Sequence, residues 1–144
     1  MCLYIDNDLH PINKHRIAER DIVVYKALDA IHETGGISPY MRATWLFGEQ
    51  KIVRIGKAKT RKGCDNDIYL IHKGLHSCNT KLKARCHGLP DNLCPAIIPK
   101  GSKLFFGTNG DIVSNALIVY KNMKELESVH CKVAKPIKKN LIAV

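Results

Sequence analysis

The 144-residue sequence has no apolar run that approaches the roughly 20 residues needed to cross a bilayer. Its N-terminus, Met1-Cys-Leu-Tyr-Ile-Asp, lacks the basic-then-apolar order of a secretion signal, so we expect a cytoplasmic protein with no membrane partner. The sequence also lacks internal repeats, linkers and low-complexity segments. Since 45% of the residues are apolar, we expect a single globular domain, 1–144, with a polar lead-in at 1–20 and a basic tail at 135–144.

No recognised catalytic signature occurs in the sequence, and a nucleophile beside a base held by a third group cannot be assigned. Cys64 lies beside Asp65 among cationic residues, which favour a thiolate, but nothing in the sequence locates a histidine partner for it. We therefore favour a protein that is not an enzyme and expect no cofactor. A Cys- or metal-dependent enzyme acting on a nucleotide remains an alternative.

Acidic residues are scarce in the middle of the chain. Between Lys51 and Lys103 there are twelve Lys or Arg and three Asp or Glu, whereas residues 1–50 contain five and seven, so most of the net charge of +10 lies in one region. Residues 51–62, the basic stretch, hold six cations and no anion. Their mutual repulsion must be offset by solvent or by an anionic partner, and this pattern indicates an anion-binding site. A solvated loop that only promotes solubility is the alternative.

Turn-forming residues separate short β-rich runs about every eight to fifteen residues, which predicts an α+β protein made mainly of an antiparallel β-sheet or partly open barrel, with one or two short helices. The Asn-Gly turn at 109–110 predicts a hairpin, and Asn122 with Glu125 three residues later predicts a capped helix over 122–128. The lead-in at 13–20 is expected to be loosely helical. The expected strands are 22–28, 40–47, 51–55, 67–72, 96–106, 112–120 and 129–134.

Alternation in the basic stretch places Lys57, Lys59 and Arg61 on one face of an extended segment, where they can converge on phosphate groups. Pro99 and Gly101 predict a tight turn that presents Lys100, Ser102 and Lys103 together. Nearby aromatic residues can stack on a base, although a single Trp is commonly part of the core. The predicted ligand-binding residues are Tyr40, Arg42, Trp45, Arg54, Lys57, Lys59, Arg61, His76, Lys100 and Lys103.

Six residues with metal-binding side chains occur within 23 positions: His72, His76, Cys78, Cys86, His87 and Cys94. Only the His72–His76 pair has the spacing of a zinc knuckle, so the cysteines are equally well explained as small buried residues. We assign no metal ligand from the sequence.

Several strings resemble short uncharacterised proteins carried by phages and mobile elements of gut bacteria. The most specific is Ile98-Pro-Lys-Gly-Ser-Lys103 followed by Gly107 to Asn115, and shorter similarities occur at 24–28, 38–40 and 73–77. The resemblance implies a bacterial host cell and an anti-defence setting, in which small phage proteins act as sponges that sequester cyclic nucleotide signals without cleaving them.

Together these observations favour non-enzymatic binding of a small anionic nucleotide-like ligand. A homodimer that buries the ligand between its subunits would suit this function. The second hypothesis is a DNA- or RNA-binding protein, in which the same cations would spread over an open surface.

Overall fold

The computed structural model describes residues 3–6, 15–38, 43–56, 59–60, 68–71, 73–80, 93–107 and 110–130. Within these ranges it contains thirteen strands and the helix α2 (Met123–Val129). The strands are β1 (Leu3–Asp6), β2 (Arg16–Ile17), β3 (Ile22–Ala27), β4 (Gly35–Ile37), β5 (Thr44–Leu46), β6 (Gln50–Ile52), β7 (Lys59–Thr60), β8 (Ile68–Ile71), β9 (Leu75–Cys78), β10 (Leu93–Ile98), β11 (Lys103–Phe106), β12 (Asp111–Ser114) and β13 (Ala116–Val119).

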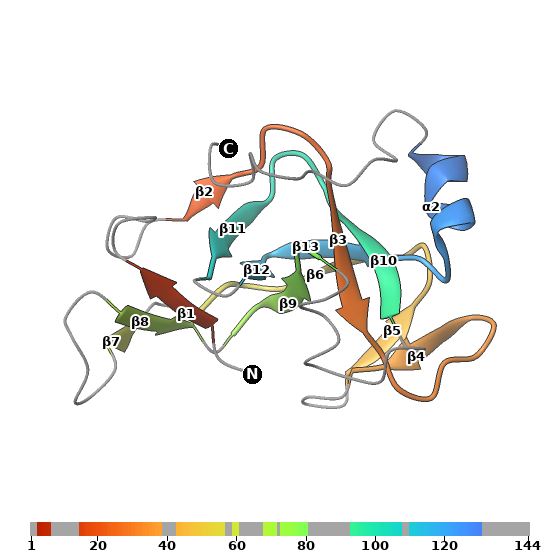
Figure 1. Ribbon diagram of the computed structural model, residues 1–144, viewed down its shortest axis with the longest axis horizontal. Helices are drawn as coiled ribbons and strands as arrows, with labels where there is room; N and C mark the ends of the chain where they lie inside the picture. Colours follow the sequence, from red (N-terminus) through yellow and green to blue (C-terminus); the bar gives the residue numbers. More distant parts are fainter. Residues whose placement is uncertain are drawn as a thin grey trace.

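Eight of these strands form one antiparallel sheet in the order β2-β11-β12-β9-β3-β10-β13-β6 (Figure 1). The sheet is open, since β2 and β6 lie at its two edges, and no closed barrel forms from the described strands. Two smaller sheets contain β1-β8-β7 and the β4–β5 hairpin. The expected mainly antiparallel α+β class is therefore confirmed, as an open sheet with one short helix among the described residues.

Strand β3 is the centre of the fold because it pairs with β10 along its whole length, from Ala27 opposite Leu93 to Ile22 opposite Ile98. Both faces of this strand are buried, which explains why the run of residues 22–28 is almost continuously apolar. One face packs Ile22 and Val24 into the main core. On the other face Val23 packs with Leu126 of α2, which lies beside β10 (Figure 1).

Two locally encoded elements agree with their sequence predictions. The β11–β12 hairpin pairs Leu104 with Ser114 and Phe106 with Ile112. At the start of α2 the side chain of Asn122 accepts a hydrogen bond from the backbone N–H of Glu125. This helix has seven residues, far fewer than a membrane-spanning helix needs, and it is the only helix in the described part of the chain.

Four element predictions were wrong. The run 96–106 is not one strand, since it divides at the turn 99–102 into β10 and β11. The described part of the lead-in is not helical, because Arg16–Ile17 pairs with β11 as the edge strand β2. The run 112–120 is not one strand, since it divides at Asn115 into β12, which pairs with β9, and β13, which pairs with β10. Val129 ends α2 rather than beginning a strand, and the rest of that expected strand, from 131 onward, lies outside the described residues.

The turn between β10 and β11 has the predicted tight geometry, with Gly101 at φ +88° and the Ser102 N–H donating to the Pro99 carbonyl. Ser102 does not face outward with the lysines as predicted, because it is buried and its hydroxyl donates to the same carbonyl over 2.6 Å. The Lys100 N–H donates to Asp21 Oδ1 over 2.7 Å. The turn is thereby attached to the residue that precedes β3.

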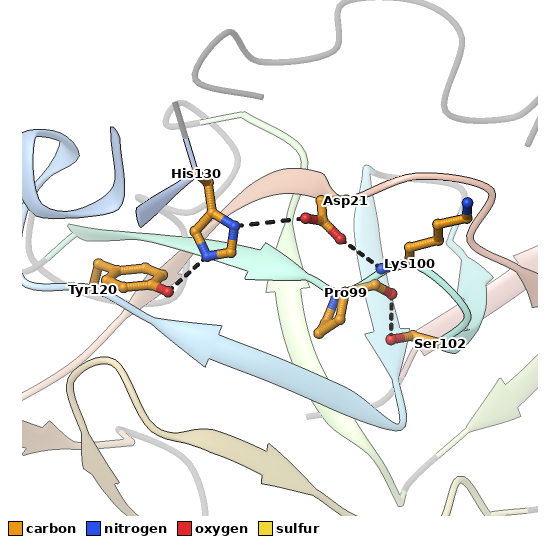
Figure 2. A network of polar contacts seen from close by, with 6 residues as sticks. All are labelled: Asp21, Pro99, Lys100, Ser102, Tyr120 and His130. Carbon is orange, nitrogen blue, oxygen red and sulfur yellow. Dashed lines mark hydrogen bonds and ion pairs between the residues drawn. The ribbon is translucent and has the colours of Figure 1, made fainter. Parts of the chain in front are cut away.

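The same aspartate continues into a polar network at this end of the sheet (Figure 2). His130 lies between Asp21 and Tyr120, with Nδ1 at 3.6 Å from Asp21 Oδ2 and Nε2 at 2.7 Å from the Tyr120 hydroxyl. Burial raises the pKa of Tyr120, and the negative charge of Asp21 acts in the same direction. The network joins the residue after α2 to the start of β3 and to the β10–β11 turn.

Candidate anion-binding site

The side chain of Lys26 lies in the protein core. Lys26 is near the end of β3, which is flanked by β9 and β10, so its ammonium group has little access to water and the residue is 8% exposed. Lys26 Nζ donates a hydrogen bond to the His76 carbonyl over 2.7 Å. No carboxylate among the described residues forms an ion pair with it. Burial of an ammonium group without a counter-ion destabilises the folded protein. An anion bound beside Lys26 would remove this destabilisation.

Burial lowers the pKa of Lys26 from its ordinary value of 10.5 to about 8. The Cys78 thiol opposes this change, whereas the positive charge of Lys51 contributes to it. The amine is still mainly protonated at neutral pH, because its pKa lies above 7. Lys26 therefore places a positive charge inside the protein under ordinary conditions.

Trp45 covers this charge from the β4–β5 hairpin. Alternation along β5 exposes Thr44 and Leu46 and buries Trp45, which is 3% exposed. Gly36 is the partner of Trp45 in β4, and a Cβ added to Gly35 would collide with the Trp45 carbonyl. The absence of a side chain at Gly35 thus lets the two short strands approach closely, and the indole ring lies 5.1 Å from Lys26 Nζ.

A second ammonium group contacts the same ring. Lys51, the first residue of the basic stretch, lies on the edge strand β6 with Nζ at 4.5 Å from the centre of the Trp45 ring. Its Nζ also donates to the Thr44 carbonyl over 2.7 Å, and partial burial lowers its pKa. Attraction to the ring stabilises each cation by about 1 kcal/mol, which offsets only part of their desolvation and mutual repulsion.

Two buried donors near Lys26 have no hydrogen-bond partner among the described residues: Trp45 Nε1 and Ser77 Oγ. The antiparallel register that pairs Tyr25 with Cys78 places Ser77 opposite Lys26 on β9, while Cys94 is opposite Lys26 on β10. Burial raises the pKa of the Cys94 thiol to about 11, so it remains neutral. The row Ser77, Lys26 and Cys94, with Trp45 and Lys51 beside it, is hereafter called the Lys26 site.

The structure brings only part of the predicted binding set to this site. Trp45 is present, but a base could stack on its ring only after displacing the groups that cover it. His76 contributes its backbone carbonyl. Arg54 follows β6 and is exposed. Lys59 is in β7, where only the backbone is described. The other predicted residues of the two central segments lie outside the described residues: Tyr40, Arg42, Lys57 and Arg61.

Lys100 and Lys103 are exposed but lie at the opposite end of β3 from Lys26. The separation along the strand is about five residues of 3.3 Å each, or roughly 16 Å. The Lys100 side chain extends away from Asp21 (Figure 2), and the Lys103 N–H donates to Asn115. These two lysines therefore do not meet the Lys26 site around one compact phosphate group.

Of the six residues considered for zinc, the structure describes His76, Cys78 and Cys94, and His72, Cys86 and His87 lie outside the described residues. No three His, Cys, Asp or Glu side chains gather as metal ligands in the part that is described. Cys94 packs into the main core, whereas Cys78 packs with Tyr25 on the other face of the sheet. Cys78 and Cys94 therefore cannot bind the same ion. Cys64, the candidate nucleophile, is also outside the described residues.

Sequence reasoning missed Lys26, Ser77 and Cys94 as a group. One signal was available, since Lys26 is the only charged residue within the apolar run 22–28. Ser77 and Cys94 are more than 15 residues apart and about 50 or more from Lys26, so only the sheet register brings them together.

Comparison of the chain with protein-family models, with curated proteins and with solved structures found no match. The functional argument therefore rests on the chemistry of the site.

Proposed function

We propose that this protein binds a small, phosphate-bearing, nucleotide-like anion and holds it without chemical change. The observation that carries the proposal is the buried Lys26 ammonium group, which has no carboxylate partner among the described residues and shares the Trp45 ring with Lys51. Both cations are partly or fully desolvated, so an anion placed beside them gains more interaction energy than it would at an exposed lysine.

The basic stretch continues from this site along the sequence. Lys51 is both part of the Lys26 site and the first cation of the stretch, and Arg54, Lys57, Lys59 and Arg61 follow it in the sequence. We assign these residues to further phosphate oxygens of the same ligand. Tyr40 and Arg42 precede β5, which carries Trp45, and we assign them to the base.

Binding without turnover fits the chemistry of the described groups at the site. The Cys94 thiol is neutral at pH 7 because burial raises its pKa, and a neutral buried thiol is a poor nucleophile. In the setting that the phage resemblance implies, the ligand would be a cyclic nucleotide messenger of host immunity. Sequestration of such a messenger requires slow release rather than catalysis, and a homodimer that encloses the ligand would slow its release further.

Native mass spectrometry tests the proposal on protein purified from cells that produce cyclic nucleotides, followed by analysis of the small molecules released on denaturation. Release of the intact messenger supports sequestration. Release of a cleaved product instead identifies an enzyme, and protein without bound nucleotide under every condition rejects the proposed function.

The salt dependence of binding separates this function from nucleic-acid binding. A surface that neutralises about six phosphates of duplex DNA gives a slope near −5 in a plot of log affinity against log salt concentration, whereas a compact ligand gives a shallower slope. A steep slope with mixed oligonucleotides, together with no affinity for mononucleotides, would assign the cations to DNA or RNA.

A further inference from the structure

The Lys26 site contains an unusual set of buried hydrogen-bond donors. An ammonium group has three N–H donors, and the structure shows one of those of Lys26 used by the His76 carbonyl. The indole N–H of Trp45 can only donate. Within the part of the chain that the structure describes, neither it nor the buried Ser77 hydroxyl has a hydrogen-bond partner. Buried polar groups in native proteins nearly always have partners, so two orphaned groups beside one buried cation require an explanation.

The chemistry of these groups selects the class of ligand. Two ammonium groups repel a metal ion. The carboxylate of Glu49 acts on the more exposed Lys51, but no carboxylate of the described residues forms an ion pair with Lys26. A neutral ligand would satisfy the hydroxyl and the indole but would leave the buried charge of Lys26 uncompensated. An oxyanion meets both requirements, because its oxygens accept several hydrogen bonds and its charge neutralises an ammonium group.

We propose that Lys26, Ser77 and the indole N–H of Trp45 form an interior site for a single phosphate group. Lys26 provides the charge, while Ser77 and Trp45 orient the oxygens. Lys51, which is more exposed, contacts the outward side of the same group and connects it to the rest of the ligand. The inference deepens the proposed function and rests on it where the phosphate belongs to a nucleotide. Inorganic phosphate has the same chemistry and is the second source that the experiment must distinguish.

The single tryptophan makes this proposal directly measurable. The spectrum of ¹⁵N-labelled protein contains one indole N–H resonance, that of Trp45, and it reports on the proposed hydrogen bond. Titration with inorganic phosphate, adenosine monophosphate and 3′,5′-cyclic adenosine monophosphate is expected to move this resonance downfield and to saturate for at least one of them. Adenosine, which has no phosphate, is expected to leave the resonance in place.

Three variants assign the binding. Lys26→Met keeps the apolar stem and removes the charge, and it is expected to weaken phosphate binding at least about 100-fold, while Ser77→Ala weakens it about tenfold. Lys124→Met is the matched control, because Lys124 is an exposed lysine of α2, which packs on the other face of the sheet, and this variant should bind phosphate as the wild type does. Without ligand, Lys26→Met is expected to melt at a higher temperature than the wild type, whereas a lysine with only a structural role would lower the melting temperature when lost.

The possible outcomes separate this inference from the proposed function. If nucleotides bind and Lys26→Met and Ser77→Ala bind them as tightly as the wild type, the interior site is refuted while the proposed function stands. If inorganic phosphate binds in a Lys26-dependent way and no nucleotide binds, the interior site is supported and the nucleotide function is rejected. Failure of every phosphate compound to move the indole resonance refutes the interior site, and the absence of bound nucleotide in native mass spectrometry refutes the proposed function. Ser77→Ala keeps the test valid if Lys26→Met does not fold.

Discussion

At the scale of single residues, the central feature is a lysine whose burial costs stability and whose surroundings do not repay that cost. The hydrogen bond to the His76 carbonyl and the contact with Trp45 are favourable, yet the pKa of Lys26 still falls to about 8. A decrease of about 2.5 pKa units corresponds to roughly 3 kcal/mol against the charged form in the folded state. Proteins commonly accept such a cost at functional sites, where a ligand removes it.

The pH dependence of stability follows from the direction of this change. The folded pKa of Lys26 is below its unfolded value, so the unfolded chain binds more protons between about pH 8 and 10.5, and stability rises with pH in that window. Cys94 acts in the opposite direction between about pH 9 and 11, because its folded pKa is raised from 9.0. The clearest interval for Lys26 is therefore pH 7.5 to 9.

We predict that the contribution of Lys26 to the free energy of unfolding rises by about 1 kcal/mol between pH 7.5 and 9. Urea denaturation of the wild type and of Lys26→Met at both pH values measures this rise as the difference between the two proteins. The subtraction removes the contribution of Cys94, whose pKa depends on burial rather than on the charge of Lys26. Equal pH dependence in the two proteins would show that Lys26 is not the titrating group. With phosphate bound, the increase should disappear from the wild type, because the ligand stabilises the protonated amine.

At the scale of secondary-structure elements, the sequence predicted correctly those elements that are determined by residues close together in the chain. The cap of α2 depends on Asn122 and Glu125, three residues apart, and the β11–β12 hairpin on a turn between adjacent runs. Strand β2 could not be predicted in this way. Its two residues become a strand only because they pair with β11, more than 80 residues later, and that pairing is not encoded in the local sequence. The Lys26 site, like β2, depends on pairing between distant parts of the chain, because it requires the registers of β9, β3 and β10 together.

The β4–β5 hairpin supplies the next prediction, because its double glycine determines where Trp45 lies. A methyl group on Gly35 would collide with the Trp45 carbonyl, which belongs to the backbone and can move only if β5 moves. We predict that Gly35→Ala destabilises the protein by about 2 kcal/mol and shifts the Trp45 fluorescence to longer wavelength as the ring becomes exposed.

Gly48→Ala is the matched control for the hairpin prediction. Gly48 has a positive φ of +77°, but a methyl group there would meet no atom within 4 Å. Gly48→Ala is expected to be destabilised only by the modest backbone strain of a non-glycine residue at positive φ. Its Trp45 fluorescence is expected to remain that of a buried indole. A red shift of the same size in both variants would mean that general loosening, rather than the position of β5, controls exposure of Trp45.

At the scale of the whole molecule, the polar network and the proposed binding site lie at different ends of β3. The Asp21, His130 and Tyr120 network connects α2, β3 and the β10–β11 turn at one end (Figure 2). The Lys26 site is at the other end, where Lys26 is opposite Cys94. The sequence predicted the class of fold and the local excess of charge, but this division depends on the antiparallel pairing of β3 with β10. That pairing carries Lys100 to the network end and Cys94 to the binding end.

This separation predicts opposite behaviour for two charged residues of the same strand region. Asp21→Ala removes the acceptor of the exposed Lys100 N–H and the partner of the partly buried His130, and it is expected to destabilise the protein by about 1 kcal/mol without changing its affinity for phosphate. Lys26→Met is expected to stabilise the protein and to weaken that affinity at least about 100-fold. Denaturation and phosphate titration on both variants provide four values. A loss of phosphate affinity in Asp21→Ala would show that the two ends are coupled through β3. A loss of stability in Lys26→Met would show that the buried ammonium group stabilises the fold and is not a binding site for an anion.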